Sequence, residues 1–287
     1  MSPYSSVQLV LLAAIWGSSF MFMKIAALPL GPAFLIEFRV LLAAVLLSGF
    51  ALYFQHRLPL IQHWQYFTII GLFNTALPFM LFAYAAQTIS AATLSILNST
   101  APIWAALITR FYFRQRLSTK INIGLLLGLF GVIILAGGDA FALGTTAIPA
   151  LIAGAAAALC YAIASHYTKT GPKLSAFHNA HGNMWAASLL VLPMLWLMPM
   201  REPATETVIW SVIFLGIVCT GFAYLLYFKL VESIGASGAL SVTFLIPLFG
   251  ILWGYLFLGE AITLSTITGA GLVIIGTVLV TGFSLKR

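Results

Sequence analysis

The feature that most constrains this chain is its scarcity of charge. Only 7% of its 287 residues are Asp, Glu, Lys or Arg, while 62% are hydrophobic. A soluble domain carries about 25% charged residues, because its surface faces water. In lipid, backbone polar groups must be bonded internally, and helices of about 20 apolar residues meet that demand. The composition therefore predicts an all-α integral membrane protein.

Polar, Pro and Gly breaks divide the chain into ten apolar segments, each predicted to be a transmembrane helix. Some connections, such as 28–32 and 87–89, are so short that consecutive helices must be antiparallel neighbours. The predicted helices cover 7–27, 33–54, 65–86, 90–110, 120–138, 146–168, 177–198, 207–229, 236–258 and 262–284.

The basic residues between these segments are unevenly distributed over the two sides of the predicted bundle. With ten crossings both termini share one side, and the opposite side carries only Lys24 and Arg201. Cytoplasmic loops are enriched in Lys and Arg, so both termini are expected in the cytoplasm of a bacterial inner membrane. The residues on the terminal side are Arg57, Arg110, Arg114, Arg116, Lys120, Lys169, Lys173, Lys229, Lys286 and Arg287.

An internal repeat appears when the sequence is compared with itself at a constant offset of 145 residues. Without any gap, Lys24 aligns with Lys169 and Pro102 with Pro247, the latter pair in mid-helix. Further matches include Trp16 with Tyr161, Gly71 with Gly216, Thr75 with Thr220, Ile89 with Ile234, Gly124 with Gly269, Gly131 with Gly276 and Gly137 with Gly282. The chain is therefore predicted to consist of two similar halves, 1–140 and 141–287.

Each half holds five predicted helices, an odd number, so the second half enters the membrane in the opposite sense to the first. Inverted repeats of this kind are the usual architecture of secondary transporters, with the substrate near the midplane between the halves. A channel or a helix-binding scaffold would share the composition but gives no reason for an inverted repeat.

Several short motifs resemble those of one family. They are WGSSF from Trp16, EFRVLLAA from Glu37, the mid-helix Pro102 and Pro247, and LFLGE ending at Glu260. Together they resemble the EamA-type exporters of the drug/metabolite transporter superfamily. The resemblance implies five-plus-five inverted topology, cytoplasmic termini and export of amino acids or other metabolites, aromatic amino acids in one branch. The chain departs from the pattern at Gln115, where the first half often carries a Glu, and Met184 stands opposite Arg39.

The fourth segment carries a polar stripe that is a candidate substrate contact. The spacing i, i+3, i+4, i+7 places its members on one helix face. Its proline frees the carbonyl of Asn98 one turn earlier, which could bond substrate or water. Hydrogen bonding between helices is the alternative role of such residues. The stripe consists of Ser95, Asn98, Ser99 and Pro102.

The equivalent face in the second half is more apolar and contains Thr243 and Pro247, which predicts a matching kink. In the first segment Trp16 and Ser19 share a face, and Tyr161 is the repeat equivalent of Trp16. These aromatic residues lie in mid-segment rather than at a headgroup belt, although packing in the core is the alternative role. All five are candidate substrate-binding residues.

Glu37 and Arg39 are the only charged residues clearly inside a predicted helix. Charges there are costly and usually face the bundle interior or water. Being two residues apart, they point to different faces and are not expected to pair with each other. Either could bind substrate; alternatively, Arg39 snorkels outward and Glu37 bonds a neighbouring helix.

The seventh segment begins with His178 and His181, spaced to share a face, but no third ligand lies nearby in sequence, so no metal site is expected. His181 is instead a candidate for lining a watery vestibule. Further lining candidates are Asn74, Pro78 and Tyr224.

No catalytic motif or ATP-binding loop is present, so an enzyme is disfavoured and no cofactor is expected. Basic residues are scattered through short loops, which argues against nucleic acid as a partner. The expected partners are a small-molecule substrate, an amino acid or related metabolite, and the lipid bilayer. Substrate identity, proton coupling and oligomeric state are left open by the sequence.

Overall fold

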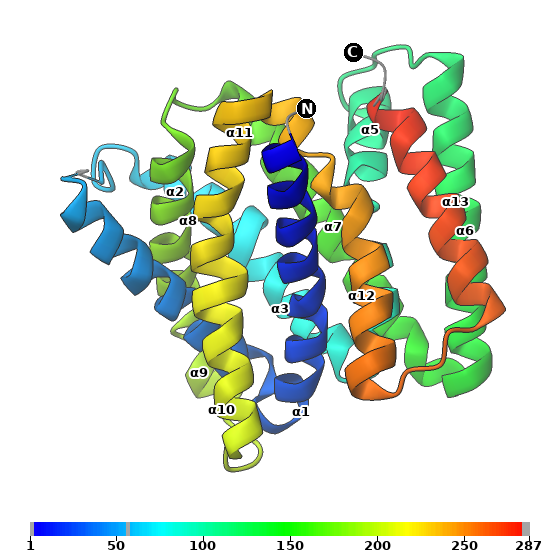
Figure 1. Ribbon diagram of the computed structural model, residues 1–287, viewed down its shortest axis with the longest axis horizontal. Coiled ribbons are helices and arrows are strands. Elements are labelled where there is room, and N and C mark those ends of the chain that lie inside the picture. Colours follow the sequence, from blue (N-terminus) through cyan, green and yellow to red (C-terminus); the bar gives the residue numbers. More distant parts are fainter. Residues whose placement is uncertain (1–2, 56–57, 283–287) are drawn as a thin grey trace.

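The computed structural model describes residues 3–55 and 58–282, and the regular structure within these ranges is entirely helical (Figure 1). The basic residues Arg57, Lys286 and Arg287, which contributed to the predicted orientation, lie outside the described residues. The N-terminal end of α1 and the C-terminal end of α13 lie at the same end of the bundle. This end is called the terminal end below.

The first helix, α1 (Pro3–Tyr53), contains 51 residues and bends at Gly31. At 1.5 Å per residue its length is about 77 Å, more than twice the hydrocarbon thickness of a bilayer. Gly31 has φ 69°, a left-handed conformation that glycine adopts without strain, and it is followed by Pro32. The bend divides α1 into the first two predicted segments.

The remaining helices overlap the other eight predicted segments, several of which contain more than one helix. The first half continues with α2 (Trp64–Gly71), the π-helix η1 (Leu72–Ala76), α3 (Leu77–Ala86), α4 (Ala91–Asn98), α5 (Ala101–Phe111) and α6 (Thr119–Leu143). The second half contains η2 (Gly144–Thr146), α7 (Ala147–Thr170), α8 (Ala176–Val191), α9 (Met194–Leu197), α10 (Glu206–Ile213), the π-helix η3 (Phe214–Phe222), α11 (Ala223–Ala239), α12 (Val242–Leu258) and α13 (Leu264–Thr281).

Within the described residues, seven helical stretches are long and apolar enough to cross a membrane, with the whole of α1 taken as one. The helix α12 is apolar but shorter, and α8 has 16 residues. The all-helical membrane fold is therefore confirmed, while the count of ten crossings stays a prediction.

The predicted span 90–110 is present as one apolar helical stretch, Ala91–Phe111, but the helix within it is interrupted. Helix α4 ends at Asn98 and α5 begins at Ala101, with a turn at Ser99 and Thr100 between them. Pro102 lies in the first turn of α5, where a missing N–H costs little, so the helix restarts there instead of kinking. The predicted segment 177–198 is likewise interrupted between α8 and α9, at Leu192 and Pro193.

The second half does not repeat the break at the equivalent place. Pro247 lies inside the continuous helix α12, and the nearest turn, at Leu240 and Ser241, lies one turn of helix earlier than the equivalent position. The two π-helices, in contrast, do correspond, because 72–76 shifted by 145 residues gives 217–221, inside η3.

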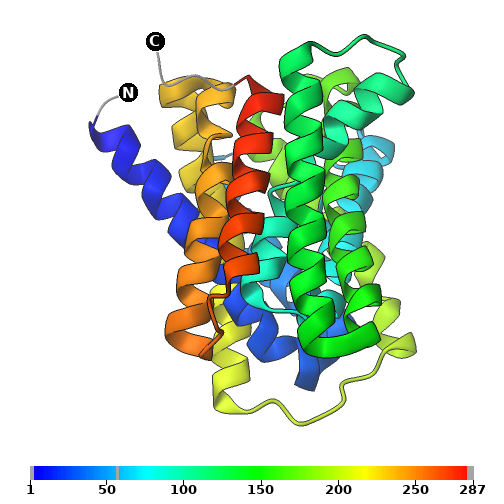
Figure 2. The same cartoon turned by 90° about the vertical axis from the view of Figure 1, so that its right-hand side faces the viewer.

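Helices α6 and α13 are equivalent in the two halves and pack side by side in opposite directions (Figure 2). Gly124 meets the carbonyl of Gly276, and Gly131 meets the carbonyl of Gly269. Since Gly124 corresponds to Gly269 and Gly131 to Gly276, each contact is the image of the other. Such a reciprocal contact is the signature of a twofold axis, so the halves are related as an inverted repeat.

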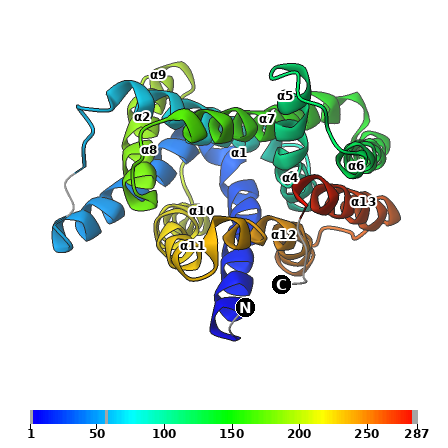
Figure 3. The ribbon, with the colours of Figure 1, turned by 90° about the horizontal axis from the view of Figure 1, so that it is seen from above.

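A second pair of contacts repeats in the same way. Gly71 on α2 packs against Ala186 and Ala187 of α8, and its equivalent Gly216 on η3 packs against Leu42 of α1, the equivalent of Ala187. Seen from the terminal end, α2 and α8 lie at one side of the bundle and α6 and α13 at the other, with α1 crossing between them (Figure 3).

Candidate substrate site

A cavity of about 1150 Å³ lies between the two halves. Residues of α1, α2, α3, α4, α5, α7, α8, α11, α12 and α13 line it, together with residues of both π-helices. Its lining extends to Tyr66, Thr168 and Thr281, which lie at the terminal ends of α2, α7 and α13. The cavity therefore runs from the middle of the bundle toward the terminal end.

Aromatic rings form two walls of this cavity, and the walls are related by the repeat. Trp16 packs against Tyr227 with ring centroids 5.6 Å apart, and Tyr161 packs against Phe82 at 6.2 Å. Trp16 corresponds to Tyr161 and Phe82 to Tyr227 at the offset of 145 residues. All four line the cavity, so a solute bound there is held between aromatic faces.

Arg39 breaks this symmetry, because Met184 occupies its equivalent position. The side chain is only 5% exposed and lines the cavity from α1. Its Nε donates a hydrogen bond to Thr220 Oγ1 at 3.0 Å, and its guanidinium lies 3.9 Å from the centre of the Phe79 ring. Arg39 therefore does not snorkel outward; the π-helical turn of η3 supplies Thr220 as the partner that holds it inside.

The break between α4 and α5 separates the polar stripe predicted there. Asn98 and Pro102 line the cavity, whereas Ser95 and Ser99 are buried and donate to the carbonyls of Ala92 and Ile96. The turn at Ser99 and Thr100 rotates one part of the predicted stripe away from the other. Ser95 instead packs against Gly250 of α12.

Polar contacts join the two halves at the end opposite the termini. Both carboxylate oxygens of Glu260 accept hydrogen bonds from the first backbone N–H groups of α4, those of Ala91 and Ala92, at 2.7 and 3.2 Å. A carboxylate at a helix N-terminus satisfies unpaired N–H groups and the helix dipole. Arg201 Nη1 of the second half donates to Gln87 Oε1 of the first at 2.6 Å, while Lys24 Nζ donates to the carbonyl of Ile89 at 2.8 Å within the first half. None of these residues lines the cavity, which is closed at this end.

Glu37 does not line the cavity either. It is 4% exposed, and its Oε1 accepts a hydrogen bond of 2.6 Å from Ser188 Oγ of α8, while Oε2 has no partner among the described residues. Glu37 and Arg39 therefore face different neighbours, as their spacing predicted.

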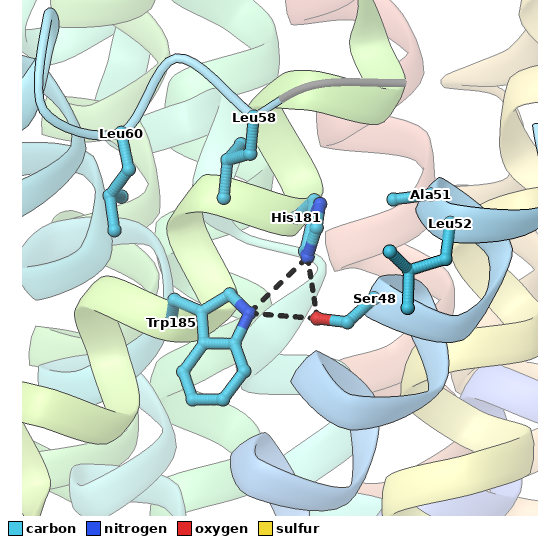
Figure 4. A pocket seen from close by; sticks show the side chains of 7 residues that line it. All are labelled: Ser48, Ala51, Leu52, Leu58, Leu60, His181 and Trp185. Carbon is cyan, nitrogen blue, oxygen red and sulfur yellow. Dashed lines mark hydrogen bonds between the residues drawn. The ribbon is translucent and has the colours of Figure 1, made fainter. Parts of the chain in front are cut away.

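His181 lies in a separate, smaller pocket between α1 and α8 (Figure 4). Trp185 Nε1 donates to Ser48 Oγ at 3.0 Å and to His181 Nε2 at 3.2 Å, and Ser48 Oγ lies 2.8 Å from the same Nε2. The three side chains form a closed polar triangle beneath Leu58, Leu60 and Leu52. The neighbouring His178 lies 2.6 Å from Ser175 Oγ through its Nδ1 and takes no part in this triangle.

The predicted site residues thus fall into two groups. Those that line the cavity are Trp16, Ser19, Arg39, Asn74, Asn98, Pro102, Tyr161, Tyr224 and Thr243. Those that the structure places elsewhere are Glu37, Pro78, Ser95, Ser99, His181 and Pro247. Pro78 is buried at the start of α3 and Pro247 is buried in α12, and neither lines the cavity.

The sequence reasoning missed several lining residues, above all Phe79, Phe82, Thr220 and Tyr227. The repeat itself carried the missing signal. Phe79 and Phe82 are the equivalents of Tyr224 and Tyr227, so the four aromatic side chains recur at one spacing in both halves.

A multi-pass helical bundle of two inverted halves around a cavity lined by a buried arginine is the usual architecture of a membrane transporter. Comparison with known families agrees, because the EamA-like transporter family matches residues 5–137 and 148–282, one match in each half. The chain belongs to the EamA-like transporter family. Its members move solutes across membranes, so the chain is a transporter with a small-molecule substrate.

Individual relatives cover nearly the whole chain. An uncharacterized transporter of Bacillus subtilis strain 168 is 28% identical over 95% of this chain and 94% of its own length. A probable terminal-alkyne amino-acid exporter of Streptantibioticus cattleyicolor is 23% identical over 97% of this chain and 94% of its own length. A solved crystal structure shares the fold with a TM-score of 0.66 at 17% identity, with both chains covered completely.

Proposed function

We propose that this chain exports small metabolites that combine a carboxylate with an apolar or aromatic body, aromatic amino acids among them. The observation that carries the proposal is the position of Arg39 between two aromatic walls in a cavity that extends to the terminal end. The amino-acid exporter among the relatives supports the same class of solute. The membrane is the bacterial inner membrane, and both termini are cytoplasmic.

The transport mechanism in this proposal is alternating access. The cavity extends to the terminal end, while the contacts of Glu260 and Arg201 between the halves hold the opposite end closed. Because the two halves repeat each other in inverted form, exchanging their conformations would close the terminal end and open the other. The halves pack against each other through two equivalent pairs of glycine contacts. This symmetry supports two conformations in which the halves exchange their roles.

Uptake of labelled aromatic amino acids into proteoliposomes tests this proposal, with Asn98→Ala as the variant and Asn122→Ala as its control. Asn98 lines the cavity, whereas Asn122 is exposed on α6. Loss of one hydrogen bond to the solute, about 1 to 1.5 kcal/mol, corresponds to roughly a tenfold loss of transport. Asn122→Ala should transport normally. Equal transport by both variants at equal expression would contradict the assignment of the cavity as the site.

A further inference from the structure

Among the side chains that the structure describes, one positive charge and no negative one line the central cavity. Arg39 lines it, and no acidic side chain that the structure describes does so. Of the six acidic residues, Glu37 faces Ser188, Glu260 caps α4, and Glu202, Glu206 and Glu232 are exposed. The sixth, Asp139, stands at a position whose side chain the structure does not describe. A buried charge without a partner is costly, which makes a bound anion the natural partner of Arg39.

The contacts of Arg39 leave the edge of its guanidinium that carries the two terminal nitrogens available to a carboxylate. Thr220 receives the Nε–H, and the Phe79 ring covers one face of the guanidinium. The two terminal nitrogens form the remaining edge, and among the described residues neither has a protein acceptor. A planar guanidinium edge binds a carboxylate through two parallel hydrogen bonds.

The surroundings of that edge match the rest of an aromatic solute. Phe79, Phe82, Trp16, Tyr161 and Tyr224 all line the same cavity, and rings stack on or against such side chains. The ammonium group of an amino acid would find only neutral acceptors there and would be repelled by Arg39. Resting on the proposed function, we infer that the site selects net organic anions, namely aromatic monocarboxylates without an ammonium group, over the zwitterionic amino acids.

Charged residues at the terminal end favour the same solute. Seven described basic residues stand there against one acid, Glu232, and they raise the local concentration of anions. The basic residues are Arg110, Arg114, Arg116, Lys120, Lys169, Lys173 and Lys229.

An anionic substrate also supplies a driving force. The protein returns to its starting state after each cycle, so the net charge moved equals the charge of the solute. A membrane potential of 100 mV, negative inside, can then hold the concentration of a monovalent anion about 50-fold higher outside than inside, without ATP or protons. A zwitterion gains nothing from the potential.

Three solutes with the same phenyl body separate these possibilities: 3-phenylpropanoate, an anion; phenylalanine, a zwitterion; and phenethylamine, a cation. Proteoliposomes containing the full chain are loaded with each labelled solute, and efflux is measured with and without a valinomycin-imposed potassium potential. We expect 3-phenylpropanoate to move at least tenfold faster than phenylalanine, and phenethylamine not at all. The potential should change the efflux of 3-phenylpropanoate only.

Arg39→Met introduces methionine, which is the residue at the equivalent position of the second half, Met184. It should abolish the preference for the anion, while Asn122→Met, at an exposed position on α6, should retain it. If Arg39→Met does not fold, the potential dependence of the wild type still decides. Phenylalanine efflux equal to or faster than that of 3-phenylpropanoate would overturn the inference and leave the proposed function standing. Failure of every carboxylate solute to move would overturn both.

Discussion

Gly131 of α6 lies directly against the carbonyl of Gly269 in α13, so that a Cβ at position 131 would meet that oxygen at 2.8 Å. The same Cβ would meet the backbone nitrogen of Val273 at 2.9 Å. Neither atom can move without shifting a helix. This contact and its image between Gly124 and Gly276 hold the two halves of the transporter together along α6 and α13.

Gly131→Ala should therefore destabilise the protein, even though alanine favours a helix by about 1 kcal/mol over glycine. Overpacking of this kind costs about 1 to 3 kcal/mol. Gly137→Ala, in the same helix, is the matched control, because a Cβ at position 137 would meet no neighbouring atom within 4 Å. Thermal unfolding in detergent should show a lower midpoint for Gly131→Ala and an unchanged or higher one for Gly137→Ala. The reverse order would refute the close contact.

The proposed orientation predicts which loops are accessible from outside the cell. In a chain whose buried Cys160 and Cys219 are replaced by alanine, Glu202→Cys in the connection before α10 should react with a membrane-impermeant maleimide in intact cells. Arg114→Cys, between α5 and α6, should react only after the cells are permeabilised. Labelling of Arg114→Cys in intact cells would reverse the orientation.

Of the acidic side chains that the structure describes, Glu37 is the one buried between helices, which makes it the group to test for proton coupling. It bonds Ser188 outside the cavity, so we expect a carrier whose flux does not depend on a pH gradient. Glu37→Gln keeps an acceptor for Ser188 and should transport normally, whereas Glu37→Ala removes it and should cost about 1 to 3 kcal/mol of stability.

Flux in proteoliposomes at matched and unmatched pH, for wild type and both variants, checks this expectation. A wild-type flux that follows the pH gradient, together with a Glu37→Gln flux that does not, would show that Glu37 carries a coupled proton.

Much of the fold could be predicted from the sequence, because lipid leaves few alternatives to apolar helices and because the offset of 145 residues exposes the repeat directly. The direction in which a side chain points was harder to predict. In a soluble helix polarity marks the outer face, but here lipid, neighbouring helices and cavity walls all accept apolar residues. For Trp16 and Tyr161, packing in the core was therefore the more frequent role to expect, although their mid-segment positions favoured the cavity.

Local backbone breaks were the other limit. Pro102 predicted a disturbance of the helix, yet whether the chain kinks or stops depends on packing around Ser99 and Thr100, and Pro247 disturbs α12 much less. The role of Glu260 was also hidden, since its partners Ala91 and Ala92 are backbone groups 169 and 168 residues away in the sequence.

The contact between α4 and α12 at the closed end offers the most direct test of alternating access. A Cβ built on Gly254 lies 3.7 Å from the Cβ of Ala91, a separation typical of a disulfide. In the background lacking Cys160 and Cys219, the double variant Gly254→Cys and Ala91→Cys should crosslink under mild oxidation. Each single variant is a control for the displacement of Glu260, which lies against Gly254.

The measurement is solute flux through the double variant in proteoliposomes, before oxidation, after it and after reduction. If the closed end must open in every cycle, oxidation should stop transport in the double variant, leave both single variants unaffected, and be reversed by dithiothreitol. Undiminished flux through fully crosslinked protein would contradict alternating access through this cavity.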